Sequence, residues 1–266
     1  IKNVMLFLQS NNVSTTHAVK IYKTYENESI PIVRENPYRL ADDIYGIGFK
    51  TADTIAQKLG MDKESPHRVM AGLKYVLSEK ADDGHVFLYR HELISACQEM
   101  LELPPDAIEH GIAALIDKAE IISEDVGQPT PTPPRSNQEG GETIYLAPFY
   151  YAEVGVANAF SRMLKMDTTG MQHAVSPQAV DRSIDRLEKS MGIHFAAHQR
   201  EAIRTAVASR VMILTGGPGT GKTTTTIGMM RLFEELGKRV LLAAPTGRAA
   251  KRLSETTGRE AKTIHR

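Results

Sequence analysis

The residues best suited to chemistry form a glycine-rich loop late in the chain. The pattern G-x-x-x-x-G-K-[ST] runs from Gly216 to Thr223 and is matched at every fixed position. Glycines lack a Cβ, so the backbone N–H groups of such a loop can converge on a polyphosphate. Lys222 brings a cation to the β- and γ-phosphates, and the Thr223 hydroxyl can bind Mg²⁺. The loop therefore predicts a nucleoside triphosphate site, against the alternative of a chance glycine-rich turn.

The elements around this loop follow in the order that phosphate binding requires. Residues 211–215 predict a buried strand before it, and residues 221–236 predict a helix after it whose positive end faces the anion. A second buried strand is predicted over 240–244, and further helices over 151–164, 177–191 and 200–208. We assign catalysis to Lys222 and Thr223, with Thr223 as the Mg²⁺ ligand. The predicted nucleotide-binding residues of the loop are Gly216, Gly217, Pro218, Gly219, Thr220, Gly221, Lys222, Thr223 and Thr224.

A second pair of glycines, Gly46 and Gly48, lies in a predicted helix, turn and helix over residues 40–56. Ile47 between them is suited to fill the space between the helices, and Lys50 adds a cation. The segment resembles a helix-hairpin-helix, in which backbone N–H groups of the turn hold a DNA phosphate without reading sequence. The alternative is an ordinary helical hairpin with a glycine turn.

A weaker copy of this pattern precedes it by 34 residues. Asn12, Val13, Ser14, Ala18 and Ile21 correspond to Gly46, Ile47, Gly48, Ala52 and Ile55. The apolar positions recur but the glycines do not, so we expect this hairpin to fold while binding phosphate weakly. Residues 1–60 are thus predicted to be a tandem with one competent DNA-binding hairpin, unless the similarity is due to chance.

The next segment, residues 61–165, predicts three short helices followed by a β-hairpin. The helical stripes include Leu73, Leu93 and Ile112, and the strands are expected at 121–124 and 143–147. Residues 127–141 are rich in Pro, Gly and polar side chains, which predicts a mobile hairpin tip. The arrangement suggests a winged-helix-like module that binds DNA or, as we favour, acts as a spacer.

Composition excludes several classes of protein. The 32 basic and 32 acidic residues give no net charge, which argues against coating nucleic acid by bulk charge. The single cysteine, Cys97, cannot form an internal disulfide and lies on an apolar helical stripe, which favours a packed core thiol. No run is long and apolar enough for a membrane span or resembles a signal peptide. We therefore expect a cytoplasmic protein, and the start at Ile1 suggests an internal piece of a longer one.

One local basic patch stands out between residues 246 and 266. Six basic and two acidic side chains leave it a charge of +4. Contact with DNA phosphates and a solvated helix face explain this charge equally well.

The motifs together resemble those of the RecD-like superfamily 1 DNA helicases. Gln199 lies ahead of the phosphate loop where these helicases keep an adenine-reading glutamine, although a surface glutamine is the default interpretation. Residues 245–253 resemble the family's motif Ia, and residues 263–266 resemble the motif that follows. Residues 36–53 are similar to the N-terminal region of the long bacterial form. The resemblance covers nearly the whole chain.

This resemblance implies a DNA motor that hydrolyses ATP with Mg²⁺, moves 5′ to 3′ and unwinds duplex. Its partners are single-stranded DNA and duplex junctions, and no RecB- or RecC-type protein is required. The implied adenine contact is Gln199. The DNA-binding residues are expected to be Gly46, Gly48 and Lys50 in the hairpin, and Thr246, Gly247 and Arg248 in motif Ia.

Parts of such a motor are not found in the sequence. No hydrophobic run followed by Asp-Glu occurs after Thr223, and the pairs at 42–43, 82–83 and 234–235 lie in other contexts. The arginine finger and second motor lobe are also missing. We expect a multidomain, truncated product: an all-α helix-hairpin-helix and winged-helix-like N-terminal region, then an incomplete α/β P-loop (RecA-like) lobe over 166–266. Alone, it is expected to bind nucleotide weakly and to be inactive.

Two other classes of function stay open at this point. A loader or recombination ATPase would share the phosphate loop without needing Gln199 or the motif Ia segment. A non-catalytic DNA-binding adaptor would use only the N-terminal modules, and it predicts that Lys222→Ala leaves the protein's activities intact.

Overall fold

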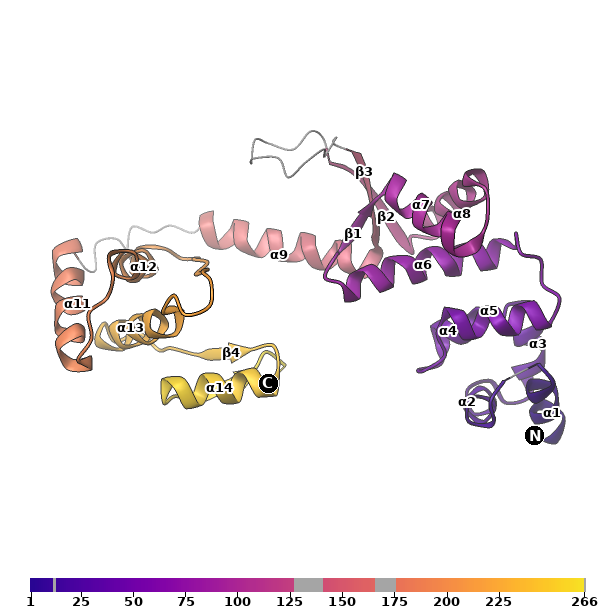
Figure 1. Ribbon diagram of the computed structural model, residues 1–266, viewed down its shortest axis with the longest axis horizontal. Helices are drawn as coiled ribbons and strands as arrows, with labels where there is room; N and C mark the ends of the chain where they lie inside the picture. Colours follow the sequence, from indigo (N-terminus) through magenta and orange to yellow (C-terminus); the bar gives the residue numbers. More distant parts are fainter. Residues whose placement is uncertain (12, 127–140, 166–175, 266) are drawn as a thin grey trace. The chain divides into compact units, whose positions relative to one another are not determined.

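The computed structural model describes residues 1–11, 13–126, 141–165 and 176–265, and divides into two compact units (Figure 1). The first unit is Ile1–Gly155 and the second is Val156–Arg266. Within the described ranges, no helix is both long enough and apolar enough to cross a membrane.

The first unit begins with short helices that form one small core. They are α1 (Lys2–Ser10), α2 (Thr15–Tyr25), the 3₁₀ turn η1 (Glu26–Glu28), α3 (Ser29–Glu35), α4 (Arg39–Asp43) and α5 (Phe49–Lys58). The helices pair as α1 with α2 and α4 with α5, as the predicted tandem requires. Val13, Ala18 and Ile21 are buried like their counterparts Ile47, Ala52 and Ile55. Asn12 lies outside the described residues.

The rest of the first unit combines three helices with a three-stranded sheet. Its elements are α6 (Pro66–Asp82), β1 (Phe87–Tyr89), α7 (Arg90–Leu101), α8 (Pro105–Asp117), β2 (Ile121–Val126) and β3 (Gly141–Leu146). The sheet is antiparallel with the order β1-β3-β2, and Ser123 of β2 lies opposite Ile144 of β3. Helix α6 packs against α7, α8 and the sheet (Figure 1).

These elements confirm the three predicted helices and both predicted strands. Strand β1 was not predicted, because three residues are too few to establish an alternating pattern. The predicted hairpin tip falls mostly on residues 127–140, which lie outside the described ranges, whereas Gly141 already belongs to β3. Cys97 is fully buried, and burial raises the pKa of its thiol to about 12, as expected of a core cysteine.

A buried ion pair connects the two parts of this unit. Asp53 of α5 accepts a hydrogen bond from Arg68 Nε of α6 at 2.8 Å, and Arg68 also donates to the carbonyl of Leu101. Tyr38 donates its hydroxyl to the same carboxylate at 2.7 Å. Arg68 is only 7% exposed, and a buried charge is stable only when other groups compensate it. These several partners supply that compensation.

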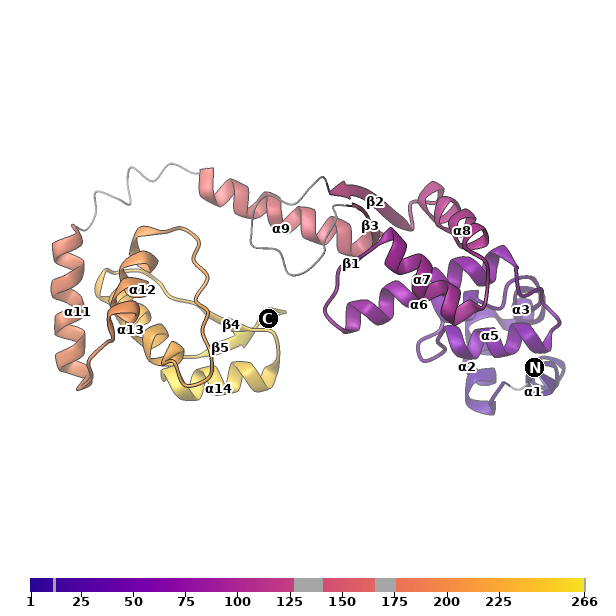
Figure 2. The same cartoon turned by 45° about the horizontal axis from the view of Figure 1, so that its top comes forward.

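Helix α9 (Ala147–Lys165) follows β3 directly and begins four residues before the predicted helix start. The second unit then consists of α11 (Pro177–Met191), α12 (Ala197–Ala208), α13 (Lys222–Glu235), β4 (Leu242–Ala244), α14 (Gly247–Thr257) and β5 (Ala261–Thr263) (Figure 2). Helix α11 begins and ends as predicted: Ser176 Oγ caps it by accepting from Ala179 N–H, and Gly192 follows it with φ +64°.

Two strand predictions in this unit are wrong or incomplete. Residues 211–215 form no strand, and Ile213 is 87% exposed. Of the strand predicted at 240–244, only β4 is formed, and it pairs in parallel with β5 over three residues. Leu241, just before β4, is 79% exposed. A parallel strand needs neighbours to accept its backbone hydrogen bonds, and among the described residues none pairs with 211–215.

Candidate nucleotide site and DNA-binding turn

The glycine-rich loop leads into α13 through backbone conformations that favour glycine. Gly219 has φ +75° and Gly221, the N-cap of α13, has φ +78°. Thr220 Oγ1 donates to the carbonyl of Gly217 at 2.9 Å. Lys222 Nζ donates to the carbonyls of Gly216 and, at 2.6 Å, Gly217. The ammonium therefore lies inside the curve of its own loop, where it can exchange carbonyl oxygens for phosphate oxygens.

Gln199 is brought against this loop from helix α12. Its Nε2 donates to the carbonyl of Thr220 at 3.3 Å, and its Oε1 accepts from Ala196 N–H at 2.9 Å. A Cβ built on Gly221 would lie 2.3 Å from Gln199 Nε2, so only glycine fits there without a shift. The sequence placed these residues 22 positions apart, and the structure makes them neighbours.

The four threonines 223–226 divide into two groups by their hydroxyl partners. Thr225 and Thr226 donate to the carbonyls of Gly221 and Lys222, one helical turn back. The Thr223 hydroxyl makes no hydrogen bond to the described part of the chain, and Thr223 is exposed. Thr223 thus has a hydroxyl available for a ligand beside Lys222. Thr224, the last predicted loop residue, is half-buried.

A charged cluster supports the segment that leads into α12. Glu188 is almost completely buried, accepts from Phe195 N–H at 2.8 Å and pairs with Arg200 at 2.9 Å. Burial raises the pKa of Glu188, but the hydrogen bonds from Phe195 and Arg200 outweigh it, and the pKa is lowered. Asp185 also pairs with Arg200, at 2.7 Å.

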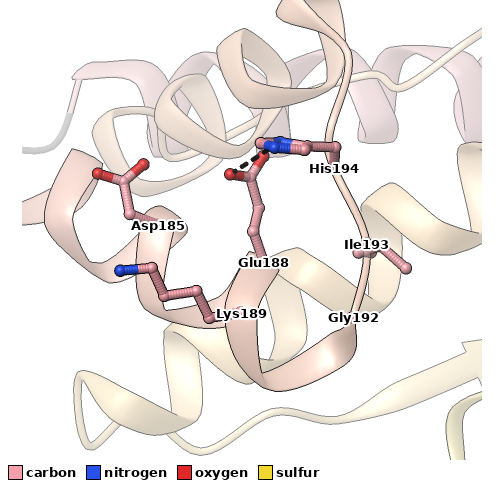
Figure 3. A pocket seen from close by; sticks show the side chains of 6 residues that line it. All are labelled: Asp185, Glu188, Lys189, Gly192, Ile193 and His194. Carbon is pink, nitrogen blue, oxygen red and sulfur yellow. Dashed lines mark ion pairs between the residues drawn. The ribbon is translucent and has the colours of Figure 1, made fainter.

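His194 completes this cluster, with Nδ1 lying 3.4 Å from Glu188 Oε2 (Figure 3). The cavity drawn there is lined by Asp185, Glu188, Lys189, Gly192, Ile193 and His194. None of these residues belongs to the glycine-rich loop, so we interpret the cluster as support for α12.

The segment compared with motif Ia begins helix α14. Thr246 is its N-cap, with Oγ1 accepting from Ala249 N–H at 3.2 Å. Gly247 and Arg248 are exposed, and Arg248 has no ion-pair partner within the described ranges. Lys251, Arg259 and Lys262 of the basic patch are paired, Arg259 with Glu234 at 2.7 Å, whereas Arg252 resembles Arg248 in having no ion pair to a described residue. Arg266 lies outside the described residues.

The turn between α4 and α5 has the predicted geometry. Gly46 has φ +92°, Ile47 is buried with 3% exposure, and Gly48 is the N-cap of α5. Gly46 and Gly48 are both exposed, as phosphate contact requires. Lys50 instead lies near Glu79 of α6 at 3.9 Å and over the Tyr75 ring at 5.5 Å.

A different lysine reaches this turn, and the sequence did not predict it. Lys20 of α2 donates from Nζ to the carbonyl of Tyr45 at 2.9 Å. A Cβ built on Gly46 would lie 3.2 Å from the same ammonium. The tandem pattern could have predicted the position of Lys20, because it implies that the second helix of the first hairpin packs near the second turn.

Comparisons with known proteins agree with this organisation. Residues 1–87 match the model of the ATP-dependent RecD2 DNA helicase HHH domain, and residues 199–266 match that of an AAA domain. The chain is 29% identical to the ATP-dependent RecD2 DNA helicase of Deinococcus radiodurans over 100% of its own length and 36% of that protein's. It is 48% identical to the RecBCD enzyme subunit RecD of Mycobacterium tuberculosis over 23% of this chain and 12% of that protein.

A third relative is similar to most of this chain. An uncharacterised protein of Methanocaldococcus jannaschii is 26% identical over 93% of this chain and 23% of its own length. The chain thus spans little more than a third of the Deinococcus relative and less of the others. The resemblance to RecD-like helicases is confirmed in both the N-terminal and the C-terminal segment.

Proposed function

We propose that this chain, similar throughout its length to a RecD2 helicase, carries the DNA-binding region and nucleotide-binding loop of an ATP-dependent DNA helicase. The observation that carries the proposal is the contact of Gln199 with the glycine-rich loop. A glutamine held 3.3 Å from the Thr220 carbonyl lies beside any nucleotide whose phosphates occupy the loop. A chance glycine-rich turn would give no reason for this contact.

The loop residues fit ATP with Mg²⁺. Gly216 through Thr224 surround the phosphate position, with Lys222 as the cation and the Thr223 hydroxyl as the magnesium ligand. A Cβ on Gly216 would clash with Thr220, and a Cβ on Gly221 would clash with Gln199. Glycine at these two positions therefore avoids both clashes in the loop. Bound Mg²⁺ would neutralise charge on the phosphates, while Gln199 would orient the base.

DNA is proposed to meet the chain at two places. The turn at Gly46 and Gly48 would hold a phosphate through backbone N–H groups, with Lys50 nearby. In the second unit, Thr246, Gly247 and the ion-pair-free Arg248 would contact a single strand. Both contacts involve phosphate, so affinity should fall with salt.

The module between them is proposed to be a winged-helix-like spacer. Its order of helix, strand, two helices and two strands supports the winged-helix-like interpretation. A spacer role is supported by Arg90, whose guanidinium is engaged by Glu109 and Glu142 and so is not free for phosphate.

Movement from 5′ to 3′ and independence from RecB- or RecC-type partners are proposed from the resemblance. The Deinococcus RecD2 similarity extends over the whole chain, whereas the RecD subunit of a RecBCD enzyme matches 23% of it. We further propose that the 266 residues alone are inactive in ATP hydrolysis. Glu234 and Glu235, the acidic pair of α13, are engaged with Arg259 and Arg186 and do not follow a strand.

Lys222→Ala in the whole protein that contains these residues tests the helicase proposal. We expect loss of duplex unwinding with binding to single-stranded DNA retained, because the lysine contacts nucleotide and not DNA. Lys238→Ala, in the exposed loop after α13, is the matched control and should unwind normally. Unwinding by the Lys222→Ala protein at the wild-type rate would contradict the proposal and favour a non-catalytic adaptor.

A further inference from the structure

One aromatic side chain at the hairpin turn lies outside the described core. Tyr45 is 96% exposed, more than any other large hydrophobic side chain among the described residues. Its neighbours Ile44 and Ile47 are buried at 5% and 3% and supply the packing of the turn. Tyr45 can be removed without opening a cavity, so folding does not explain it.

One cation lies beside this ring, and a second follows five positions later in the chain. Lys20 Nζ lies 6.0 Å from the Tyr45 ring centroid and donates to the Tyr45 carbonyl at 2.9 Å. One hydrogen of the ammonium is used in that bond, which leaves two for an external acceptor. Lys50 follows in the first turn of α5 with a side chain that is 76% exposed.

Acidic groups nearby are directed elsewhere. Asp43 accepts from the Tyr25 hydroxyl at 2.6 Å and pairs with Arg39. Asp42 pairs with Lys74 at 3.0 Å. The carboxylates of α4 are therefore partly neutralised by their own partners, while Lys20 Nζ lies at the turn.

We propose that Tyr45 stacks on an unpaired base while Lys20 binds the adjoining phosphate. This inference rests on the proposed DNA-binding function and adds a preference to it. A paired base inside a duplex has both faces covered by its neighbours, so the ring can stack only on single strands or at a frayed end. The hairpin turn thus selects single-stranded DNA and duplex ends over continuous duplex.

The arrangement also gives the first hairpin a function. It lacks the glycines of the second turn, but its helix α2 supplies Lys20 to that turn. The two hairpins therefore act as one site, with the backbone turn from the second and a cation from the first.

Binding of the 266-residue chain to a single-stranded oligonucleotide carrying 2-aminopurine tests the proposal. The measurements use an Arg248→Ala background, so that the second unit does not mask the effect. Tyr45→Ala should weaken binding about tenfold, within the roughly 5- to 150-fold range of one base–aromatic stack, and abolish fluorescence quenching. Tyr45→Phe should retain both. The affinity of Tyr45→Ala for a closed circular duplex, which offers no end to stack on, should stay within about twofold of the background protein.

Two further variants separate the possible outcomes. Tyr151→Ala removes an exposed tyrosine of α9 and should bind like the background protein. Lys20→Gln should weaken binding and lower the salt dependence by about one phosphate contact. Unchanged single-strand affinity and quenching in Tyr45→Ala, with DNA binding still intact, would overturn the stacking inference alone. Absence of DNA binding by the wild-type chain would overturn the proposed function as well.

Discussion

The two units bury their apolar side chains to different extents. In the first, Leu73, Ile108 and Ile144 are fully buried and belong to a core shared by α6, α7, α8 and the sheet. In the second, Ile213 and Leu241 are 87% and 79% exposed, and the core is a smaller cluster around Ile184 and Ile203. Antiparallel strands and adjacent helices can pair locally along the chain, whereas a parallel sheet needs strands separated by crossovers. The antiparallel sheet completes the core of the first unit, whereas in the second unit Ile213, just before the glycine-rich loop, and Leu241 stay exposed.

Removing a buried charge should give the largest difference between the units. Asp53→Ala leaves Arg68 buried without its carboxylate and should cost about 3–5 kcal/mol of unfolding free energy. Asp181→Ala removes the exposed partner of Arg204 in the second unit and should cost about 0–1 kcal/mol. Urea unfolding followed by circular dichroism measures both. Equal losses would show that burial of the Asp53–Arg68 pair adds nothing to the cost of breaking it.

Adding one methyl group at a helical glycine in each unit compares how tightly the two hydrophobic cores are packed. A Cβ on Gly111 would lie 2.5 Å from Val69 Cγ1, and one on Gly228 would lie 2.7 Å from Phe195 Cζ. Both substitutions to alanine should destabilise by about 1–3 kcal/mol, with Gly111 costing more because its neighbours are held in the larger core. Hydrogen exchange can assign each effect to its unit.

Gly155→Ala is the control, since a Cβ there meets no described atom within 4 Å. It should stabilise helix α9 by about 0.5–1 kcal/mol. If Gly228→Ala proved the more costly of the two core variants, the order proposed for the cores would be reversed.

High pH should weaken the first unit through Cys97. Its pKa is raised from 9.0 to about 12 by burial, so the unfolded chain loses the thiol proton first as pH increases. The stability contributed by keeping the thiol neutral is fully present below pH 9 and is lost between pH 9 and about 12. By pH 10 the loss is about 1.4 kcal/mol.

Comparison with Cys97→Ala isolates the effect of this thiol on stability from that of every other titratable group. The stability difference between wild type and variant should shrink as pH rises from 8 to 10. A difference that stays constant over this range would mean that the thiol is accessible to water in the folded chain.

Sequence reasoning succeeded where structure depends on neighbouring residues. The turn at Gly46 and Gly48, the cap at Ser176 and the helix after the glycine-rich loop follow from local backbone and hydrogen-bonding requirements. The strand predicted at 211–215 failed, because its apolar residues indicate a strand only if other strands pair with it. Propensity alone supplies no backbone partners.

Contacts between distant residues were also missed. Lys20 reaches Tyr45 across 25 positions, and no local pattern marks that lysine. The pair of Asp53 and Arg68 was not predicted either, because charged residues are buried only when a partner is present, and the partner lies on another helix. The contact of Gln199 with the loop came from family resemblance, not from spacing.

Calorimetric titration of the 266-residue chain with a non-hydrolysable ATP analogue tests the central claim, that the loop before α13 holds a nucleoside triphosphate. We predict Mg²⁺-dependent binding that Lys222→Ala weakens by roughly 10- to 150-fold, the loss of one charge-assisted hydrogen bond, while Lys238→Ala binds like wild type. Equal affinity of the wild-type and Lys222→Ala chains, or no binding by either, would contradict it.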